Sequence, residues 1–175
     1  IRQILVDAFE SCEVTEAQNA AELMTLIRAE TWDAVVLDIT LPDRNGLDVL
    51  KDLKQERPHL PVVVLSMHSM PSEGVDADVV IGTLGRSTAS DRLVDGLEKA
   101  VRAFGLRVVH DVPYAGGATT ARLGKPQAGM HAMQVEVARR LYMNERTFCR
   151  YPEGFSMVRS LCRTMVATMG RAAVG

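Results

Sequence analysis

Hydrophobic and polar positions recur along this chain with two periods, one typical of helices and one typical of strands. The stretch Ala20–Glu30 places four apolar side chains on one face at a spacing of three to four residues, as an amphipathic helix does. The same spacing predicts further helices over Ile1–Phe9, from Gly46 to the residues before Pro58, over Arg92–Phe104 and over Phe155–Ala173.

Short apolar runs rich in β-branched residues lie between these helices. Ala34–Asp38 and Leu60–Ser66 are too short for helices, and their composition is typical of strands buried in a parallel sheet. Further strands are predicted at Cys12–Ala17, Ala77–Gly82, Leu106–His110 and Met130–Arg140. Alternating helices and strands predict an α/β fold with a mostly parallel sheet flanked by helices, and they place functional residues at the carboxyl ends of the strands.

Composition limits the partners that the chain is expected to have. A formal charge of -2 gives no strong field for nucleic acid or anionic lipid, so we expect neither a nucleic-acid partner nor a membrane partner. No apolar run approaches the ~20 residues of a membrane span, and no leader precedes Ile1, which predicts a cytoplasmic protein. Three widely spaced cysteines, Cys12, Cys149 and Cys162, argue against a disulfide framework.

The character of the sequence changes near residues 70–75. We therefore expect two incomplete α/β segments, residues 1–69 and 76–175, joined by a junction at 70–75. In the first segment Asp38 ends one predicted strand and Ser66 ends the next. A carboxylate there could attack a phosphoryl group while the hydroxyl binds a phosphoryl oxygen. The alternative is that Asp38 caps the following turn and Ser66 satisfies a backbone group.

The residues around Asp38 and Ser66 resemble a known family. Val35-Val36-Leu37-Asp38-Ile39-Thr40-Leu41-Pro42-Asp43-Arg44-Asn45-Gly46-Leu47 and Pro61-Val62-Val63-Val64-Leu65-Ser66-Met67-His68-Ser69 are similar to receiver domains of two-component response regulators, whose fold is flavodoxin-like. The resemblance covers about residues 1–69. It implies that Asp38 is phosphorylated by a partner histidine kinase with Mg²⁺ and that Ser66 is the switch hydroxyl.

The first segment also departs from the receiver pattern. Receivers begin with a strand that ends in a Mg²⁺-binding acidic pair, for which Asp7 and Glu10 are poor substitutes, and no later strand ends in the family's Lys. Phosphoryl transfer depends on charge neutralisation, so we expect it to be impaired. In the flavodoxin-like order the missing first strand lies between the second and third strands. Either Cys12–Ala17 pairs with the Asp38 strand, or a strand from the second segment fills the gap.

The second segment carries its own candidate chemistry on and beside the strand predicted at 130–140. Glu136 follows Gln134 on this strand, downstream of a loop with paired glycines. A carboxylate in that position could act as a general acid or base, and Arg139 could hold a substrate carboxylate through two hydrogen bonds. The alternative is that Glu136 forms a simple surface ion pair with Arg139 or Arg140.

This segment also resembles a known family, over about residues 76–170. Asp111-Val112-Pro113-Tyr114-Ala115-Gly116-Gly117, Gly124-Lys125-Pro126 and Gly129-Met130-His131-Ala132-Met133-Gln134-Val135-Glu136-Val137-Ala138-Arg139-Arg140-Leu141-Tyr142-Met143-Asn144-Glu145 are similar to the carboxyl-terminal part of N-formylglutamate amidohydrolases. The resemblance implies hydrolysis of a small N-formyl acidic amino acid by a zinc-activated water, in a fold related to zinc carboxypeptidases. It assigns proton transfer to Glu136, orientation of substrate or of Glu136 to Gln134 and Arg139, substrate binding to Gly116, Gly117 and Thr120, and a metal-ligand role to His131.

The zinc ligands of that family are not recognisable in the sequence. No His-Ser-Gly motif occurs, and His59, His68, His110 and His131 show no ligand spacing, whereas a catalytic zinc needs about three protein ligands. Three functions stay open: a zinc amidohydrolase, a phosphoacceptor signalling module, and a packed remnant without catalysis. We predict a hybrid that is catalytically incomplete, whether the fusion is natural, artificial or mis-joined.

Overall fold

The computed structural model describes residues 15–174. The predicted helix at Ile1–Phe9, with Asp7 and Glu10, therefore lies outside the described residues, as does Cys12. The strand predicted at Cys12–Ala17 lies partly outside them, and its described part, residues 15–17, is not in a strand.

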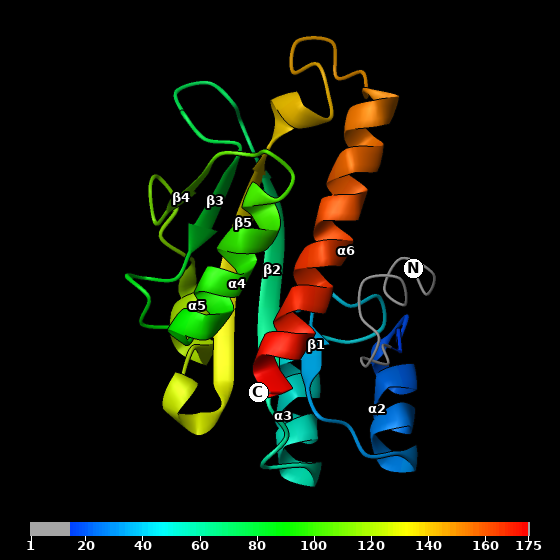
Figure 1. The fold of residues 1–175 in the computed structure, drawn as a ribbon. Helices are drawn as coiled ribbons and strands as arrows, with labels where there is room; N and C mark the ends of the chain where they lie inside the picture. Colours follow the sequence, from blue (N-terminus) through cyan, green and yellow to red (C-terminus); the bar gives the residue numbers. More distant parts are fainter. Residues whose placement is uncertain (1–14, 175) are drawn as a thin grey trace.

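Five strands form one sheet in the order β1-β2-β5-β3-β4 (Figure 1). Neighbouring strands are parallel except β3 and β5, which are antiparallel. The predicted α/β class with a mostly parallel sheet is thus confirmed, and the antiparallel pair is a feature that the sequence pattern did not indicate. The strands are β1 (Val35–Leu37), β2 (Val62–Met70), β3 (Val79–Gly82), β4 (Val108–His110) and β5 (Met130–Ala138).

Helices cover both faces of this sheet (Figure 1). On one face α4 and α6 pack against each other and against the strands; on the other, α2 and α3 cover the β1 and β2 end while α5 lies against β5. The helices are α2 (Ala20–Ala29), α3 (Gly46–Glu56), α4 (Asp91–Arg102), α5 (Ala118–Leu123) and α6 (Pro152–Val174), with short 3-10 helices η1 (Pro126–Ala128) and η2 (Arg139–Leu141).

The central pair of the sheet, β2 and β5, joins the two segments. The two strands are parallel and pair residue for residue from Val62 and Met130 to Met70 and Ala138. Strand β2 therefore continues past Ser66, where the sequence pattern ended it, because β5 supplies hydrogen-bonding partners along its whole length. Residues 68–70 thereby become part of a strand with a defined inner and outer face.

The place of β5 in the sheet differs from the alternative in which a strand of the second segment fills the gap beside the Asp38 strand. In the flavodoxin-like order 2-1-3-4-5, β1 and β2 correspond to the third and fourth strands. Strand β5 pairs with the outer side of β2, which is the place of the fifth strand rather than of the first. Among residues 15–174, no strand pairs with the other side of β1.

The two larger hydrophobic cores mix residues from the two segments. Val63 and Leu65 of β2 pack with Leu161 and Met165 of α6 in the core under α4 and α6. In the core under α2 and α3, Ala132 of β5 lies among residues of the first segment. Burial of apolar surface dominates folding energetics, so neither segment keeps its full core without the other.

The loop after β1 is held by close backbone packing and by helix capping. A Cβ atom on Gly46, the first residue of α3, would lie 2.6 Å from the Cα atom of Ile39, so only glycine fits without a shift. The Asp43 carboxylate in the same loop accepts hydrogen bonds from the backbone N–H groups of Ala20 and Ala21 at the start of α2. These contacts fix the carboxyl end of β1.

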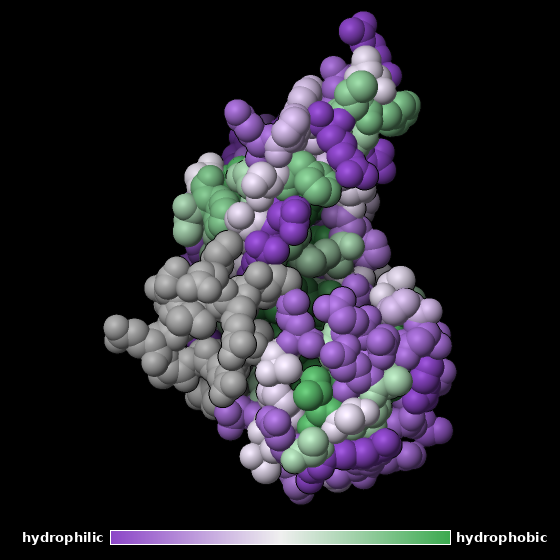
Figure 2. Space-filling view, turned by 90° about the vertical axis from the view of Figure 1, so that its right-hand side faces the viewer, coloured by the Kyte–Doolittle hydropathy of each residue, from purple (hydrophilic) through white to green (hydrophobic). Residues whose placement is uncertain are grey.

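The surface seen from the α2 and α6 side is uneven in hydropathy. Figure 2 shows a mainly hydrophilic lower part and hydrophobic side chains gathered higher up. Large apolar side chains that are well exposed include Met67, Val112, Phe148 and Tyr151. Within residues 15–174, no helix is both long enough and apolar enough to span a bilayer.

Candidate functional site

One face of the β2 and β5 pair carries a polar zone between two apolar clusters. Side chains alternate between faces along a strand, so even-numbered residues of the two strands share the face on which α2 and α3 lie. Toward the amino ends these residues belong to the core under α2 and α3, and toward the carboxyl ends Met70 and Ala138 pack with Val80 of β3. Between these clusters lie Ser66, His68, Gln134 and Glu136, which we call the polar belt.

Glu136 is the buried member of the polar belt, with 7% of its surface exposed. Its Oε1 atom accepts a hydrogen bond from Gln134 Nε2 at 2.7 Å, and Gln134 Oε1 accepts one from the backbone N–H of Gly117, also at 2.7 Å. An amide side chain offers one acceptor and one donor group, so this chain of contacts fixes the direction of Gln134 and, through it, the carboxylate.

The loop that carries Gly117 is positioned by the end of β3. A Cβ atom on Gly82 would lie 2.6 Å from the backbone nitrogen of Gly116 and 2.7 Å from the carbonyl oxygen of Tyr114. Glycine at position 82 therefore lets the loop cross directly over the strand. The Asp111 carboxylate holds the base of the loop by accepting hydrogen bonds from the backbone N–H groups of Thr83 and Gly85 at 2.7 and 2.9 Å.

The structure places the predicted substrate-binding residues around this loop. Gly116 has a φ of +115°, a conformation that L side chains rarely adopt. Thr120 in α5 is buried, and its methyl group lies 3.2 Å from where a Gly116 Cβ atom would stand. Gly116, Gly117 and Thr120 are thus brought together, with Gly117 in direct contact with Gln134.

Ser66 and His68 supply the β2 side of the polar belt. The Ser66 Oγ and His68 Nε2 atoms are 2.7 Å apart, a hydrogen bond whose direction follows the imidazole tautomer. Ser66 is in register with Gln134, and His68 with Glu136. Ser66 is half-buried and His68 is exposed. Across residues 15–174 no hydrogen bond or ion pair joins His68 to Glu136, so the two pairs lie side by side without a direct link.

Sequence reasoning missed His68 as a member of the site. Strand β2 continues past Ser66 and includes residue 68, so the His68 side chain lies on the same face as Ser66. A strand that ended at Ser66 would not place His68 there. Period-two alternation through Ser66, His68 and Met70 was the signal that could have found it.

Arg139 does not join Glu136 in the structure. Its guanidinium lies 3.4 Å from both the Oγ and the carbonyl oxygen of Ser69. Arg140 instead binds Asp78 and the carbonyl oxygen of Ala77. The predicted surface ion pair of Glu136 with either arginine is therefore wrong, since Glu136 is buried and bonds to an amide.

His131 lies on the other face of β5, away from the polar belt. It is in register with Val63, which belongs to the core under α4 and α6. Its Nδ1 atom accepts a hydrogen bond from the backbone N–H of Ser90 at 3.3 Å. Burial lowers the pKa of His131, and the positive charge of Lys54 lowers it further. His131 and Glu136 therefore cannot share a metal ion.

The described residues do not offer a metal centre. Within residues 15–174, no three His, Cys, Asp or Glu side chains come together in a way that could hold a metal ion. The two groups of the polar belt that could ligate, His68 and Glu136, fall short of the three protein ligands of a catalytic zinc. The residues that the structure describes thus do not fit the zinc that the family resemblance implies.

At the end of β1, the Asp38 side chain is exposed and serves the following turn. Its Oδ1 atom accepts a hydrogen bond from the backbone N–H of Thr40 at 3.0 Å, which confirms the turn-capping alternative. The Ser66 hydroxyl bonds to His68 rather than to a backbone group. Nothing among the described contacts joins Asp38 to Ser66.

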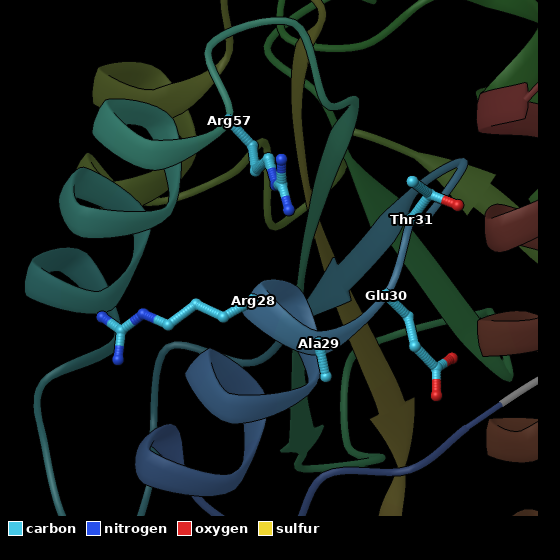
Figure 3. A pocket seen from close by; sticks show the side chains of 5 residues that line it. All are labelled: Arg28, Ala29, Glu30, Thr31 and Arg57. Atoms are coloured by element: carbon cyan, nitrogen blue, oxygen red, sulfur yellow. The ribbon is translucent and has the colours of Figure 1, made fainter.

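A separate hollow of about 500 Å³ lies at the carboxyl end of α2, and it contains no candidate residue. Figure 3 shows Arg28 and Glu30 pointing in opposite directions from its edge. Arg28 is already paired with Glu56, and Arg57 donates to the carbonyl oxygen of Ile27. Its lining residues are Arg28, Ala29, Glu30, Thr31 and Arg57.

Two family models match this chain. The N-formylglutamate amidohydrolase model matches residues 47–143, more than half of the chain. The response regulator receiver domain model matches residues 1–82. Both matches include residues 47–56 of α3 and the whole of β2, so the amidohydrolase match begins well before Asp76 and contains His68.

Known proteins resemble either the first segment or most of the chain. The chain is 41% identical over 58 residues to the probable transcriptional regulatory protein TcrX of Mycobacterium tuberculosis (33% of this chain, 25% of that protein). It is 36% identical over 63 residues to the DNA-binding transcriptional regulator NtrC of Escherichia coli K12 (36% and 13%). A solved N-formylglutamate amidohydrolase from Ralstonia eutropha JMP134 superimposes with a TM-score of 0.59 at 28% identity, covering 73% of this chain and 47% of that chain. The chain thus spans a quarter or less of these two regulators and about half of the solved enzyme.

Proposed function

We propose, since this chain belongs to the N-formylglutamate amidohydrolase family, that its polar belt is the acid and base part of an amide-hydrolysing site that lacks a metal centre within the described residues. The chain is a hybrid, because its first part also matches the receiver domain family. The observation that carries the proposal is the buried Glu136 carboxylate, held through Gln134 by the backbone of Gly117.

Glu136 has the surroundings that a proton-transferring carboxylate needs. It is buried and accepts one fixed hydrogen bond through Oε1, so its position is set before any substrate arrives. In amide hydrolysis such a group takes a proton from the attacking water and delivers one to the leaving amine. Gln134 is the residue that orients it, and the loop with Gly116 and Gly117 lines the substrate side.

We assign the carboxylate of the acidic substrate to Arg139. A guanidinium offers two parallel donors to a carboxylate, and Arg139 directly follows β5 at the end of the sheet where Glu136 lies. Its contacts with Ser69 are long, at 3.4 Å, so a substrate carboxylate would replace them at little cost. The proposed substrate class is a small N-acyl amino acid with an acidic side chain.

The missing metal centre limits this function. Zinc would activate the attacking water in the family, but the described residues offer His68 and Glu136 without a third ligand. We therefore expect this chain by itself to hydrolyse N-formylglutamate too slowly to detect.

Zinc uptake and formate release test the proposal together. The purified chain would be dialysed against zinc, its metal content measured, and formate release from N-formylglutamate followed. We expect no stoichiometric zinc and no formate above a protein-free blank. Stoichiometric zinc with formate release would overturn the part of the proposal that denies a metal centre. If Glu136→Gln then left this release unchanged, as the control Glu153→Gln in the first turn of α6 should, the acid and base role of Glu136 would be overturned as well.

A phosphoacceptor role at Asp38 is the second candidate. Asp38 is exposed at the carboxyl end of β1 and lies within the receiver match. Its partners would be a histidine kinase and Mg²⁺. Acetyl phosphate with Mg²⁺ tests the acceptor without a kinase: a labile phosphoryl group that Asp38→Asn prevents would support this role, and its absence at long incubation would remove it.

A further inference from the structure

Ser66 and His68 form a hydrogen-bonded pair that the proposed amide hydrolysis does not use as a unit. Their side chains stand two residues apart on the same face of β2, with Ser66 Oγ and His68 Nε2 at 2.7 Å. This is the separation at which a serine hydroxyl and an imidazole act as nucleophile and base. Hydroxyl activation of this kind needs no metal ion.

The backbone under this pair is rigid. Ser66 and His68 lie inside β2, which is paired with β5 at every residue from Val62 to Met70. Side chains carried on paired strands keep their mutual geometry better than side chains on loops. The pair is also reachable, since Ser66 is half-buried and His68 is exposed, so a small substrate can approach the hydroxyl.

Glu136 places a carboxylate next to the base of this pair. It is in register with His68 on the neighbouring strand, and neighbouring strands are about 4.8 Å apart. The negative charge of this carboxylate on the neighbouring strand would stabilise the positive charge that develops on His68 while the serine proton is transferred. Glu136 would act here as a positioning residue, through charge rather than through a hydrogen bond.

We propose that Ser66 is a metal-independent nucleophile, activated by His68, that accepts acyl groups from activated carboxylic esters. In the first step the Ser66 Oγ atom bonds to the acyl carbon, the bond from that carbon to the leaving oxygen breaks, and His68 passes the serine proton to the leaving alcohol. In the second step water attacks the acyl-serine, His68 takes the water proton, and the Ser66 oxygen recovers it as the carboxylic acid leaves. This reaction goes beyond the proposed amide hydrolysis, because Ser66 forms the covalent bond to the acyl group and His68 transfers the proton to the leaving alcohol.

The test uses the whole chain with p-nitrophenyl acetate in the presence of EDTA. We expect a burst of nitrophenolate of about one equivalent per chain, with mass spectrometry of peptides locating one acetyl group on Ser66. His68→Gln should slow the burst by about 10²-fold or more, and Ser66→Ala should abolish it. Glu136→Gln should slow it by a smaller factor.

Matched controls separate this chemistry from general reactivity. Ser69→Ala removes a hydroxyl from the other face of the same strand, and His59→Gln removes an exposed imidazole before β2. Both variants should keep the burst, and circular dichroism should show that every variant is folded. A burst that survives Ser66→Ala, or an acetyl group found on His68 or elsewhere, would overturn the proposal. EDTA removes metal ions, so the result does not depend on the zinc experiment. The Ser66 proposal and the amide-hydrolysis proposal can therefore be refuted independently.

Discussion

The end of β1 and the middle of the β2 and β5 pair each carry a carboxylate, and their surroundings differ sharply. Asp38 is exposed and bonds to the turn that follows it. Glu136 is buried and is held by a side chain that a distant loop fixes. Both carboxylates belong to segments with a recognisable ancestry. The difference teaches that position on a strand does not by itself make a carboxylate part of a functional site. The neighbouring elements decide whether it is buried and held by other side chains.

The sheet explains why the two regions differ. Glu136 lies on a strand with a partner on each side, β2 and β3, and both partners contribute residues around it. Among the described residues β1 has a partner on one side only. The chain thus assembles its more complete group of polar side chains, the polar belt, where the two segments meet, and not within either segment.

The largest expected effect comes from the core that the two segments share. Leu161→Ala in α6 removes a fully buried side chain that packs in the same cluster as Val63 and Leu65 of β2. We expect a loss of about 2–5 kcal/mol in the free energy of unfolding, measured by urea denaturation. The exposed Arg159→Ala variant on the same helix should change stability by less than about 0.5 kcal/mol. A neutral Leu161→Ala would show that α6 does not stabilise the first segment.

Gly82→Ala should be the next most damaging change. Its methyl group would meet the backbone of Gly116 and Tyr114, and overpacking of this kind costs about 1–3 kcal/mol. Gly96→Ala in α4 is the matched control, because its methyl group would lie at an ordinary 3.4 Å from a side-chain carbon of Thr168 in α6. Alanine also favours the helix at that position more than glycine does. Equal effects of the two substitutions on the urea midpoint would contradict the close crossing of the loop over β3.

Gln134→Ala compared with Asp38→Asn tests the two carboxylates directly. Removing Gln134 leaves the buried Glu136 without its hydrogen-bond donor, which should cost about 1–3 kcal/mol. Asp38→Asn changes an exposed group that can still accept from Thr40, so stability should stay within about 0.5 kcal/mol. Thermal melts of both variants would show which substitution lowers stability more. A larger loss for Asp38→Asn than for Gln134→Ala would refute the contrast between the two regions.

The smallest effect concerns His131, on the face opposite the polar belt. Its folded pKa is lowered by burial and by Lys54, so the unfolded chain binds a proton more readily. The unfolded state then holds more protons below its ordinary pKa of about 6.5, and stability falls as the pH drops through that value. His131→Gln should flatten this part of the curve between about pH 7 and pH 5, as followed by urea denaturation at each pH. An unchanged dependence of stability on pH in His131→Gln would show that His131 does not contribute to it.

Local patterns predicted most elements and part of the site. The periods located β5 and α4 closely, and they placed Gln134 and Glu136 on one strand below a glycine loop, all of which the structure shows. The local pattern could not give the register of His68 with Glu136, because that register depends on which distant strand lies beside β2. The local pattern also could not show that Arg139 contacts Ser69 rather than Glu136, because the chain leaves the strand after Ala138 and strand alternation no longer places the Arg139 side chain.

The claim that the two segments fold as one unit is tested most directly by comparing two probes during one denaturation. Trp32, whose indole N–H donates to the carbonyl oxygen of Leu26, reports the first segment through its fluorescence. Cys162 in α6, whose thiol pKa is raised by burial, reports the second through its reaction with a thiol reagent in a chain with Cys12 and Cys149 replaced by serine. We predict that fluorescence and thiol exposure change at the same urea concentration. Two separate transitions would contradict the shared sheet and, with it, the polar belt.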